Sequence, residues 1–163
     1  MAGKYREMLG HADSFRDLVV YQKTRWVARA IFFVSRTFPK AEASALTDQV
    51  RRSSRSMGAQ IAEAWAKRPY QKHFVTKLVD ADSERLETQH WLEIAEDCAY
   101  LDPEQVRCLL TKLSEIGRML HSMIAKAGSF CAEGPDRVRE ASAIYFPSPD
   151  QGLSSPTPFP VHG

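Results

Sequence analysis

The chain has 163 residues, of which 44% are hydrophobic and 26% are charged, and its formal net charge is +2. This composition is typical of one globular domain with a buried core. Residues 1–11 lack the apolar segment of a signal peptide, and the densest apolar stretch, 27–34, is too short to cross a membrane. The three cysteines fit neither a zinc site nor a disulfide framework, and Cys98 and Cys108 are interpreted as small buried residues. We therefore expect a soluble cytoplasmic protein.

Three isolated prolines, Pro39, Pro69 and Pro103, divide residues 14–127 into four blocks. Because proline is rare inside helices, each one indicates a junction between helices. The first two blocks predict helices over about 15–37, with Asp13 or Ser14 as N-cap, and over about 41–67. Steps of three or four residues predict the inward row of the first helix: Phe15, Leu18, Val19, Gln22, Trp26, Ala30, Val34 and Phe38. The same spacing predicts the row of the second: Leu46, Val50, Ser53, Met57, Ile61 and Ala64.

The third block predicts a helix over about 70–99, with two neighbouring apolar rows. Its main row is as follows: Phe74, Leu78, Ala81, Thr88, Leu92, Ala95 and Ala99. Beside it lies a second row: Val75, Val79, Leu86, His90 and Ile94. The fourth helix is expected to begin with Asp102 as N-cap and Pro103 in its first turn. It is expected to bury one further row: Val106, Leu109, Leu113, Ile116, Leu120 and Met123.

These four long patterns, with short connections and no competing strand signal, predict an all-α fold. We expect an antiparallel up-down-up-down four-helix bundle with an irregular C-terminal tail. The predicted organisation is a flexible N-terminus over 1–13, the bundle over 14–127 and a Pro-rich irregular tail over 128–163.

Several motifs occur in a fixed order along the first three blocks. They are FRDLVVYQK at 15–23, Phe38-Pro39, QVRRSSRS at 49–56, IAE at 61–63 and LETQ at 86–89. In this succession the chain resembles the bacterial 23S rRNA intervening sequence proteins, also labelled S23. It departs from the family pattern at Ala64, where a glycine is usual, and at Asp82-Ser83, where a Gly-Ser pair is usual.

The resemblance implies a small helical bundle, in some members encoded within intervening sequences of large-subunit ribosomal RNA genes. A related group, the accessory proteins of diversity-generating retroelements, forms barrel-shaped pentamers. Those proteins bind nucleic acid and a reverse transcriptase through basic surface. For this chain the resemblance implies a homo-oligomer, with a pentamer as the expected assembly, and a partner that is RNA, DNA or another protein.

Positive charge is concentrated in the first half of the chain. Residues 1–72 carry 14 Lys or Arg and 6 Asp or Glu, whereas residues 73–127 carry 6 and 10. The outward arc of the second helix and its end supply the candidate nucleic-acid-binding residues: Arg51, Arg52, Arg55, Lys67 and Arg68. The alternative is a solvated face, or ion pairs with the acidic third helix. Aromatic stacking platforms are not apparent, so binding is expected to be directed mainly to the backbone.

Small residues form a second candidate surface on the second helix, because they let another helix approach closely. The expected oligomer contacts combine this stripe with an aromatic residue off the main row of the third helix: Gly58, Ala59, Ala62, Ala66 and Trp91. The alternative is an internal face that is merely wide. Contacts of this kind would fit a closed ring.

No catalytic, cofactor or metal site is expected. Glu87 and His90 have the spacing of half a di-metal carboxylate site, but the second half is missing; His90 is interpreted as a partly buried helix residue. Glu63 has no paired acid or base, and an ion pair with Lys67, four residues on, is the favoured role.

The leading hypothesis is therefore a non-enzymatic oligomer that binds RNA or DNA without sequence specificity. A protein adaptor with no nucleic-acid role is the alternative. A bundle metalloprotein is the third hypothesis.

Overall fold

A computed structural model describes residues 12–131 of the 163. It contains four long helices, α2 (Val19–Val34), α3 (Asp48–Ala66), α4 (Gln71–Asp97) and α5 (Pro103–Ala125). The shorter elements, in chain order, are as follows: η1 (Phe15–Asp17), η2 (Ser35–Thr37), η3 (Lys40–Glu42), the π-helical turn η4 (Ala43–Thr47) and α6 (Ala127–Phe130). No strand occurs within this range, so the expected all-α class is confirmed. The expected character of the tail beyond residue 131 lies outside the described residues.

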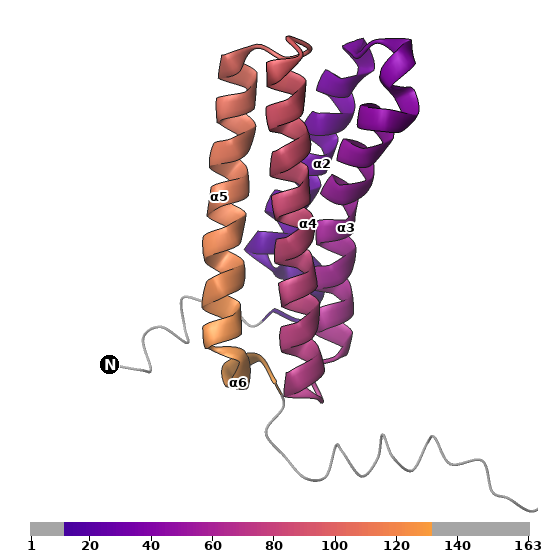
Figure 1. Cartoon of the computed structure of the whole chain (residues 1–163). Coiled ribbons are helices and arrows are strands. Elements are labelled where there is room, and N and C mark those ends of the chain that lie inside the picture. The colour runs from indigo at the N-terminus through magenta and orange to yellow at the C-terminus, as the bar shows by residue number, and fades with distance from the viewer. Residues whose placement is uncertain (1–11, 132–163) are drawn as a thin grey trace, which may run out of the picture. The chain divides into compact units, whose positions relative to one another are not determined.

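The four long helices lie side by side and form a bundle (Figure 1). The principal contacts join α2 to α3, α3 to α4, α4 to α5 and α5 back to α2, so each long helix has two main neighbours. The contact between α3 and α4 is the most extensive. No helix in the part of the chain that the structure describes is both long enough and apolar enough to cross a membrane.

The predicted start of the fourth helix is confirmed. The side chain of Asp102 accepts hydrogen bonds from the backbone N–H groups of Glu104 and Gln105, both at 3.0 Å, and Pro103 occupies the first turn. The Gln105 side chain in turn accepts from the Asp102 N–H, which completes a capping box. Ser14 also forms a capping box, with Asp17, but it starts the short helix η1 and not α2.

The predicted inward rows of the second and fourth helices and the main row of the third are buried, apart from the terminal Ala99, which is exposed. The second predicted row of the third helix is not buried, because Val79, Leu86 and His90 are exposed. Opposite these apolar rows each helix presents polar side chains, so only one rotation of the helix about its axis buries the apolar surface. The hydroxyl groups of Ser53 on α3 and Thr88 on α4 are fully buried and lie 2.9 Å apart. Each hydroxyl also lies within hydrogen-bond distance of a carbonyl on its own helix, Ser53 of Val50 O at 3.4 Å and Thr88 of Glu84 O at 2.8 Å, so both buried hydroxyls have partners.

The predicted inward row of the first helix is wrong within α2, although Leu18 and Phe38, at the two ends of the row, are buried. Val19 and Trp26 are 56% and 47% exposed, whereas Val20 and Val27 are 2% and 0% exposed. The buried row of α2 is displaced by one residue from the predicted one: Val20, Thr24, Val27 and Ile31. Because α2 has apolar residues on nearly every side, two rows one residue apart fit the helical period equally well.

Cys98 and Cys108 are exposed, so their predicted burial is also wrong. Cys98 ends α4, and Cys108 lies on the outer side of α5, where its neighbour Leu109 takes the inward position.

Helix α4 ends in a Schellman motif with an unusual residue. The N–H of Ala99 donates to Glu96 O at 2.8 Å, and the N–H of Tyr100 donates to Ala95 O at 2.9 Å. Ala99 has a φ of 56°, in the left-handed region that glycine adopts without cost.

Ala99→Gly should therefore raise the free energy of unfolding by about 0.5–1 kcal/mol, because relief of the left-handed strain exceeds the extra entropy of glycine in the unfolded chain. Urea denaturation followed by circular dichroism measures this change. The control is Ala59→Gly on the exposed side of α3, which should lower stability by about 1 kcal/mol. A loss of stability in Ala99→Gly would contradict the interpretation.

The buried hydroxyl pair gives a second prediction. Thr88→Val should lower the free energy of unfolding by about 1–2 kcal/mol, because the buried Ser53 hydroxyl loses its closest partner. The double variant Ser53→Ala with Thr88→Val should be less destabilised than the sum of the single variants, since neither polar group then remains. The same denaturation experiment provides the double-mutant cycle, and additive effects would show that the two hydroxyls are not coupled.

Candidate nucleic-acid interface

Three arginines gather on the outer face of α3 around an open depression of about 500 Å³. Its lining consists of six residues from one stretch of the helix: Asp48, Arg51, Arg52, Arg55, Ser56 and Ala59. The three arginines, named here the arginine cluster, lie within little more than one helical turn and line the same depression. Asp48 is the single carboxylate in the lining, so the depression has an excess of positive charge.

Arg51 is held against α2 by two contacts. Its Nε donates a hydrogen bond to Ser35 Oγ at 2.8 Å, and its guanidinium carbon lies 5.0 Å from the centroid of the Phe32 ring. Both partners come from the end of α2 and the turn that follows it. Arg51 is therefore half-buried and fixed in orientation. Its Nε is engaged by Ser35, and its two terminal guanidinium nitrogens make no hydrogen bond to the described residues.

Arg52 faces the opposite neighbour, α4. Its Nη2 lies 3.0 Å from Gln49 Oε1 and 3.0 Å from Glu87 Oε1. The Arg52 side chain is largely exposed, so the ion pair with Glu87 stabilises the fold by no more than about 1 kcal/mol. Glu87 Oε1 also accepts a hydrogen bond from Trp91 Nε1 at 3.2 Å.

Arg55 is exposed and makes no hydrogen bond, ion pair or ring contact with any residue between 12 and 131. Of the three clustered arginines it is the one whose whole guanidinium group is available to a ligand. The expected ion pairing with the acidic third helix therefore applies to Arg52 and does not extend to Arg55.

A buried carboxyl group lies next to the Arg52–Glu87 pair. One carboxyl oxygen of Glu84 is shielded from solvent and has no hydrogen-bond partner among the described residues. Burial raises the pKa of Glu84 above its ordinary value, the negative charge of Glu87 raises it further, and the Arg52 cation acts in the opposite direction. The α4 side of the arginine cluster thus carries acidic groups that counter part of its positive charge.

The other two predicted binding residues, Lys67 and Arg68, form a separate patch at the end of α3. Twelve residues separate Arg55 from Lys67, about 18 Å along a helix axis. Lys67 is exposed, whereas Arg68 packs over Trp65, with its guanidinium carbon 3.4 Å from the ring centroid, and donates from Nε to the Trp65 carbonyl at 3.0 Å. Of the five predicted binding residues, the structure therefore brings together only the three of the arginine cluster.

The predicted small-residue stripe is partly wrong, because Gly58 is buried inside the bundle. A Cβ atom at this position would lie 3.2 Å from Thr24 Oγ1 and 3.5 Å from the ring of Tyr21, so Gly58 allows α3 to approach α2 closely. Ala59 and Ala66 are exposed and Ala62 is half-buried, as the outer stripe requires. The remaining predicted oligomer contact, Trp91, is half-buried against the core.

Glu63 does not pair with Lys67, so that prediction is wrong. Its carboxylate lies 2.7 Å from Lys77 Nζ on α4. The hydrogen bond to Glu63 is the main cause that raises the pKa of Lys77. Glu63 therefore joins α3 to α4 on the outside of the bundle, a structural role.

Across residues 12–131, the His, Cys, Asp and Glu side chains form no group of three or more that could hold a metal ion. Glu87 is engaged by Arg52 and Trp91. His90 is exposed, not partly buried as expected, and its ring lies 4.9 Å from that of Trp91.

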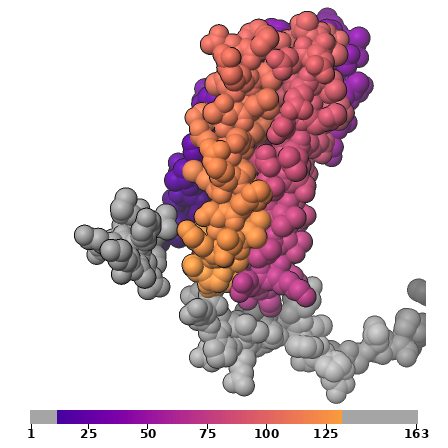
Figure 2. Space-filling model, turned by 60° about the vertical axis from the view of Figure 1, so that its left-hand side comes forward, coloured from indigo at the N-terminus to yellow at the C-terminus, as the bar shows by residue number. Residues whose placement is uncertain are grey.

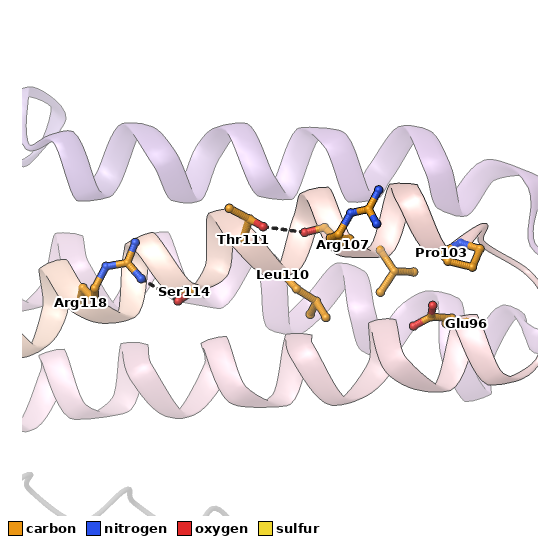
Figure 3. A pocket seen from close by; sticks show the side chains of 8 residues that line it. Glu96, Pro103, Arg107, Leu110, Thr111, Ser114 and Arg118 are labelled. Carbon is orange, nitrogen blue, oxygen red and sulfur yellow. Dashed lines mark hydrogen bonds between the residues drawn. The ribbon is translucent and has the colours of Figure 1, made fainter.

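A second open depression, of about 410 Å³, was not anticipated from the sequence. It follows α5 from Pro103 to Arg118 and includes Glu96 of α4 (Figure 3). Helices α4 and α5 lie side by side on this part of the bundle (Figure 2). The polar side chains that line this depression form hydrogen bonds within α5. Thr111 Oγ1 donates to the Arg107 carbonyl at 2.8 Å, and Arg118 Nη1 donates to Ser114 Oγ at 2.8 Å. With one carboxylate, no histidine and no cysteine in its lining, it offers no acid–base pair.

Comparison with known proteins places the chain in a family. Residues 16–122 match the family described as 23S rRNA-intervening sequence protein. A crystal structure of a protein with unknown function from the S23 ribosomal protein family of Bacteroides thetaiotaomicron VPI-5482 is similar, with 30% sequence identity and a TM-score of 0.59. The similarity covers 65% of this chain and 98% of that one. No curated protein matches significantly. The chain belongs to the 23S rRNA-intervening sequence protein family.

Proposed function

We propose that the protein is a non-enzymatic cytoplasmic oligomer that binds the backbone of RNA or DNA through the arginine cluster on α3. The observation that carries this proposal is the position of Arg51, Arg52 and Arg55 around one open depression, with Arg55 unpaired among residues 12–131. Lys67 and Arg68 would extend the contact to a second phosphate-binding patch at the other end of the helix.

Clustered arginines suit this role for two physical reasons. Each contact with a phosphate releases condensed counterions, which favours association most strongly at low salt. The guanidinium fork also offers two parallel hydrogen bonds to phosphate oxygens. The family description, which refers to 23S rRNA, supports nucleic acid as the ligand class. We propose contacts to phosphate groups only, so the binding is independent of sequence.

The proposed assembly is a homo-oligomer, with a pentamer as the expected form. The exposed Ala59 and Ala66, on the outer arc of α3, support it because small side chains let another helix approach closely. The proposed topology of each subunit is an antiparallel up-down-up-down bundle. Its support is the brevity of the connections, since only residues 67–70 separate α3 from α4 and 98–102 separate α4 from α5.

A protein adaptor is the second candidate function. The observation in its favour is the exposure of two large apolar side chains, Val79 and Leu86, on the outer side of α4. They lie seven residues apart and therefore on one line along the helix, a pattern that is typical of helix–helix contacts between proteins. In this case nucleic acid would not be the ligand.

The arginine cluster can be tested by neutralising it. The triple variant Arg51→Gln, Arg52→Gln and Arg55→Gln is preferred to charge reversal, which would place a carboxylate beside Glu87. With a generic RNA, wild-type affinity should fall steeply between about 50 and 200 mM salt. The variant should bind at least about tenfold more weakly at low salt, with a salt dependence reduced by up to about three charges. Fluorescence anisotropy titrations measure both quantities.

The matched control neutralises three basic residues at the other side of the bundle: Arg107→Gln, Arg118→Gln and Lys126→Gln. It removes the same net charge and should change affinity much less. Circular dichroism checks that both variants remain folded. Equal losses of RNA affinity in the two variants would mean that net charge alone drives binding. A wild-type protein that does not bind RNA would favour the protein adaptor.

A further inference from the structure

Large aromatic side chains are exposed along the outer face of α2. Trp26 and Phe33 lie seven residues apart and therefore on one side of the helix, and Phe33 is 50% exposed. Phe32, which is 38% exposed, meets the Phe33 ring edge-on with the ring centroids 5.6 Å apart. Trp26 was not expected at the surface, because the predicted inward row of this helix placed it in the core.

Only positive charge accompanies these rings. No aspartate or glutamate occurs between residues 18 and 41, a range that includes all of α2. The exposed cations of this range are Arg25, Arg29, Arg36 and Lys40. At 100° per residue, Arg25 and Arg29 fall on the side of α2 opposite to its buried row, and Arg36 follows in η2. The guanidinium carbon of Arg29 lies 5.8 Å from the centroid of the Phe33 ring. Rings and guanidinium groups thus alternate on one face, named here the aromatic strip.

The aromatic strip adjoins the arginine cluster. Arg51 of α3 lies over the Phe32 ring and donates a hydrogen bond to Ser35, directly after α2. An extended ligand that contacts the arginine cluster therefore reaches the aromatic strip by crossing the boundary between α3 and α2.

We infer that the aromatic strip binds the unpaired bases of a single-stranded nucleic acid, whose phosphates are held by the neighbouring arginines. This inference rests on the proposed function and specifies its ligand. Exposed rings stack with the faces of unpaired bases whatever their sequence, and arginines beside them neutralise the backbone. In a duplex those base faces are already stacked on one another, so the rings would add little.

The charge of the strip argues against its main alternative, a second copy of the chain placed face to face. A symmetric contact brings the same patch of both subunits together, so the arginines of one strip would meet those of the other. Like charges at an interface oppose association. A polyanion with apolar faces complements both properties of the strip, its positive charge and its exposed rings.

The test compares one oligonucleotide of about twelve nucleotides, within the usual site sizes of single-strand binders, with a duplex of the same sequence. Anisotropy titrations use the full chain and the variants Trp26→Ala, Phe33→Ala and Trp26→Phe. Wild type should prefer the single strand. Each alanine variant should weaken single-strand binding about tenfold and leave duplex binding nearly unchanged, whereas Trp26→Phe, which keeps a ring, should retain most of the affinity.

The matched controls are Val79→Ala and Leu86→Ala, which remove exposed apolar side chains from α4 and should leave single-strand affinity unchanged. Equal affinity for both probes with no effect of the ring variants would overturn the inference and leave the proposed function standing. Absence of binding to either probe would overturn both. A smaller light-scattering mass for Trp26→Ala, with unchanged single-strand affinity, would identify the strip as a contact between subunits and also overturn the inference.

Discussion

The close approach of α3 to α2 at Gly58 sets the rotation of α2 about its own axis. With no side chain at Gly58, Thr24 and Tyr21 pack directly against the α3 backbone, and this contact selects which apolar row of α2 faces inward. Once Thr24 is inside, Val20, Val27 and Ile31 follow it, and Trp26 and Phe33 turn to the surface. The exposed chemistry of α2 therefore follows from its rotation in the bundle, which the close approach at Gly58 accommodates.

The helices were predictable where polar and apolar residues separate cleanly. On α3 and α5 the arginine, lysine and glutamate residues occupy one side, so the 3.6-residue period fixes the buried row. On α2 nearly every side carries an apolar residue, and the period alone does not choose between rows that start at Val19 and Val20. Gly58 was misplaced for a related reason, since a glycine shows no preference for either side until the neighbouring helix is known.

The candidate site was predictable in its local part and not in its tertiary part. The spacing of Arg51, Arg52 and Arg55 follows from the sequence, because residues three and four apart share a helix face. Their differences do not, since Ser35 and Phe32 hold Arg51 from α2 and Glu87 holds Arg52 from α4. Glu63 illustrates the same limit: Lys67 is its nearest basic residue along the helix, but Lys77 lies within 2.7 Å on the adjacent one.

The pair between Arg52 and Glu87 has a consequence for any anion that approaches α3. Glu87 already accepts a hydrogen bond from Arg52 Nη2, with a carboxylate oxygen at 3.0 Å, and thus takes a donor that a phosphate oxygen could use. It therefore acts as an internal competitor, tethered at a high effective concentration by the fold. An incoming anion must displace Glu87 from Arg52 Nη2 or bind through the other guanidinium nitrogens of the cluster. Glu87 can keep its hydrogen bond to Trp91 when it is displaced. This internal competition weakens the binding of a polyanion and speeds its release, so a bound polyanion can exchange while the bundle stays folded.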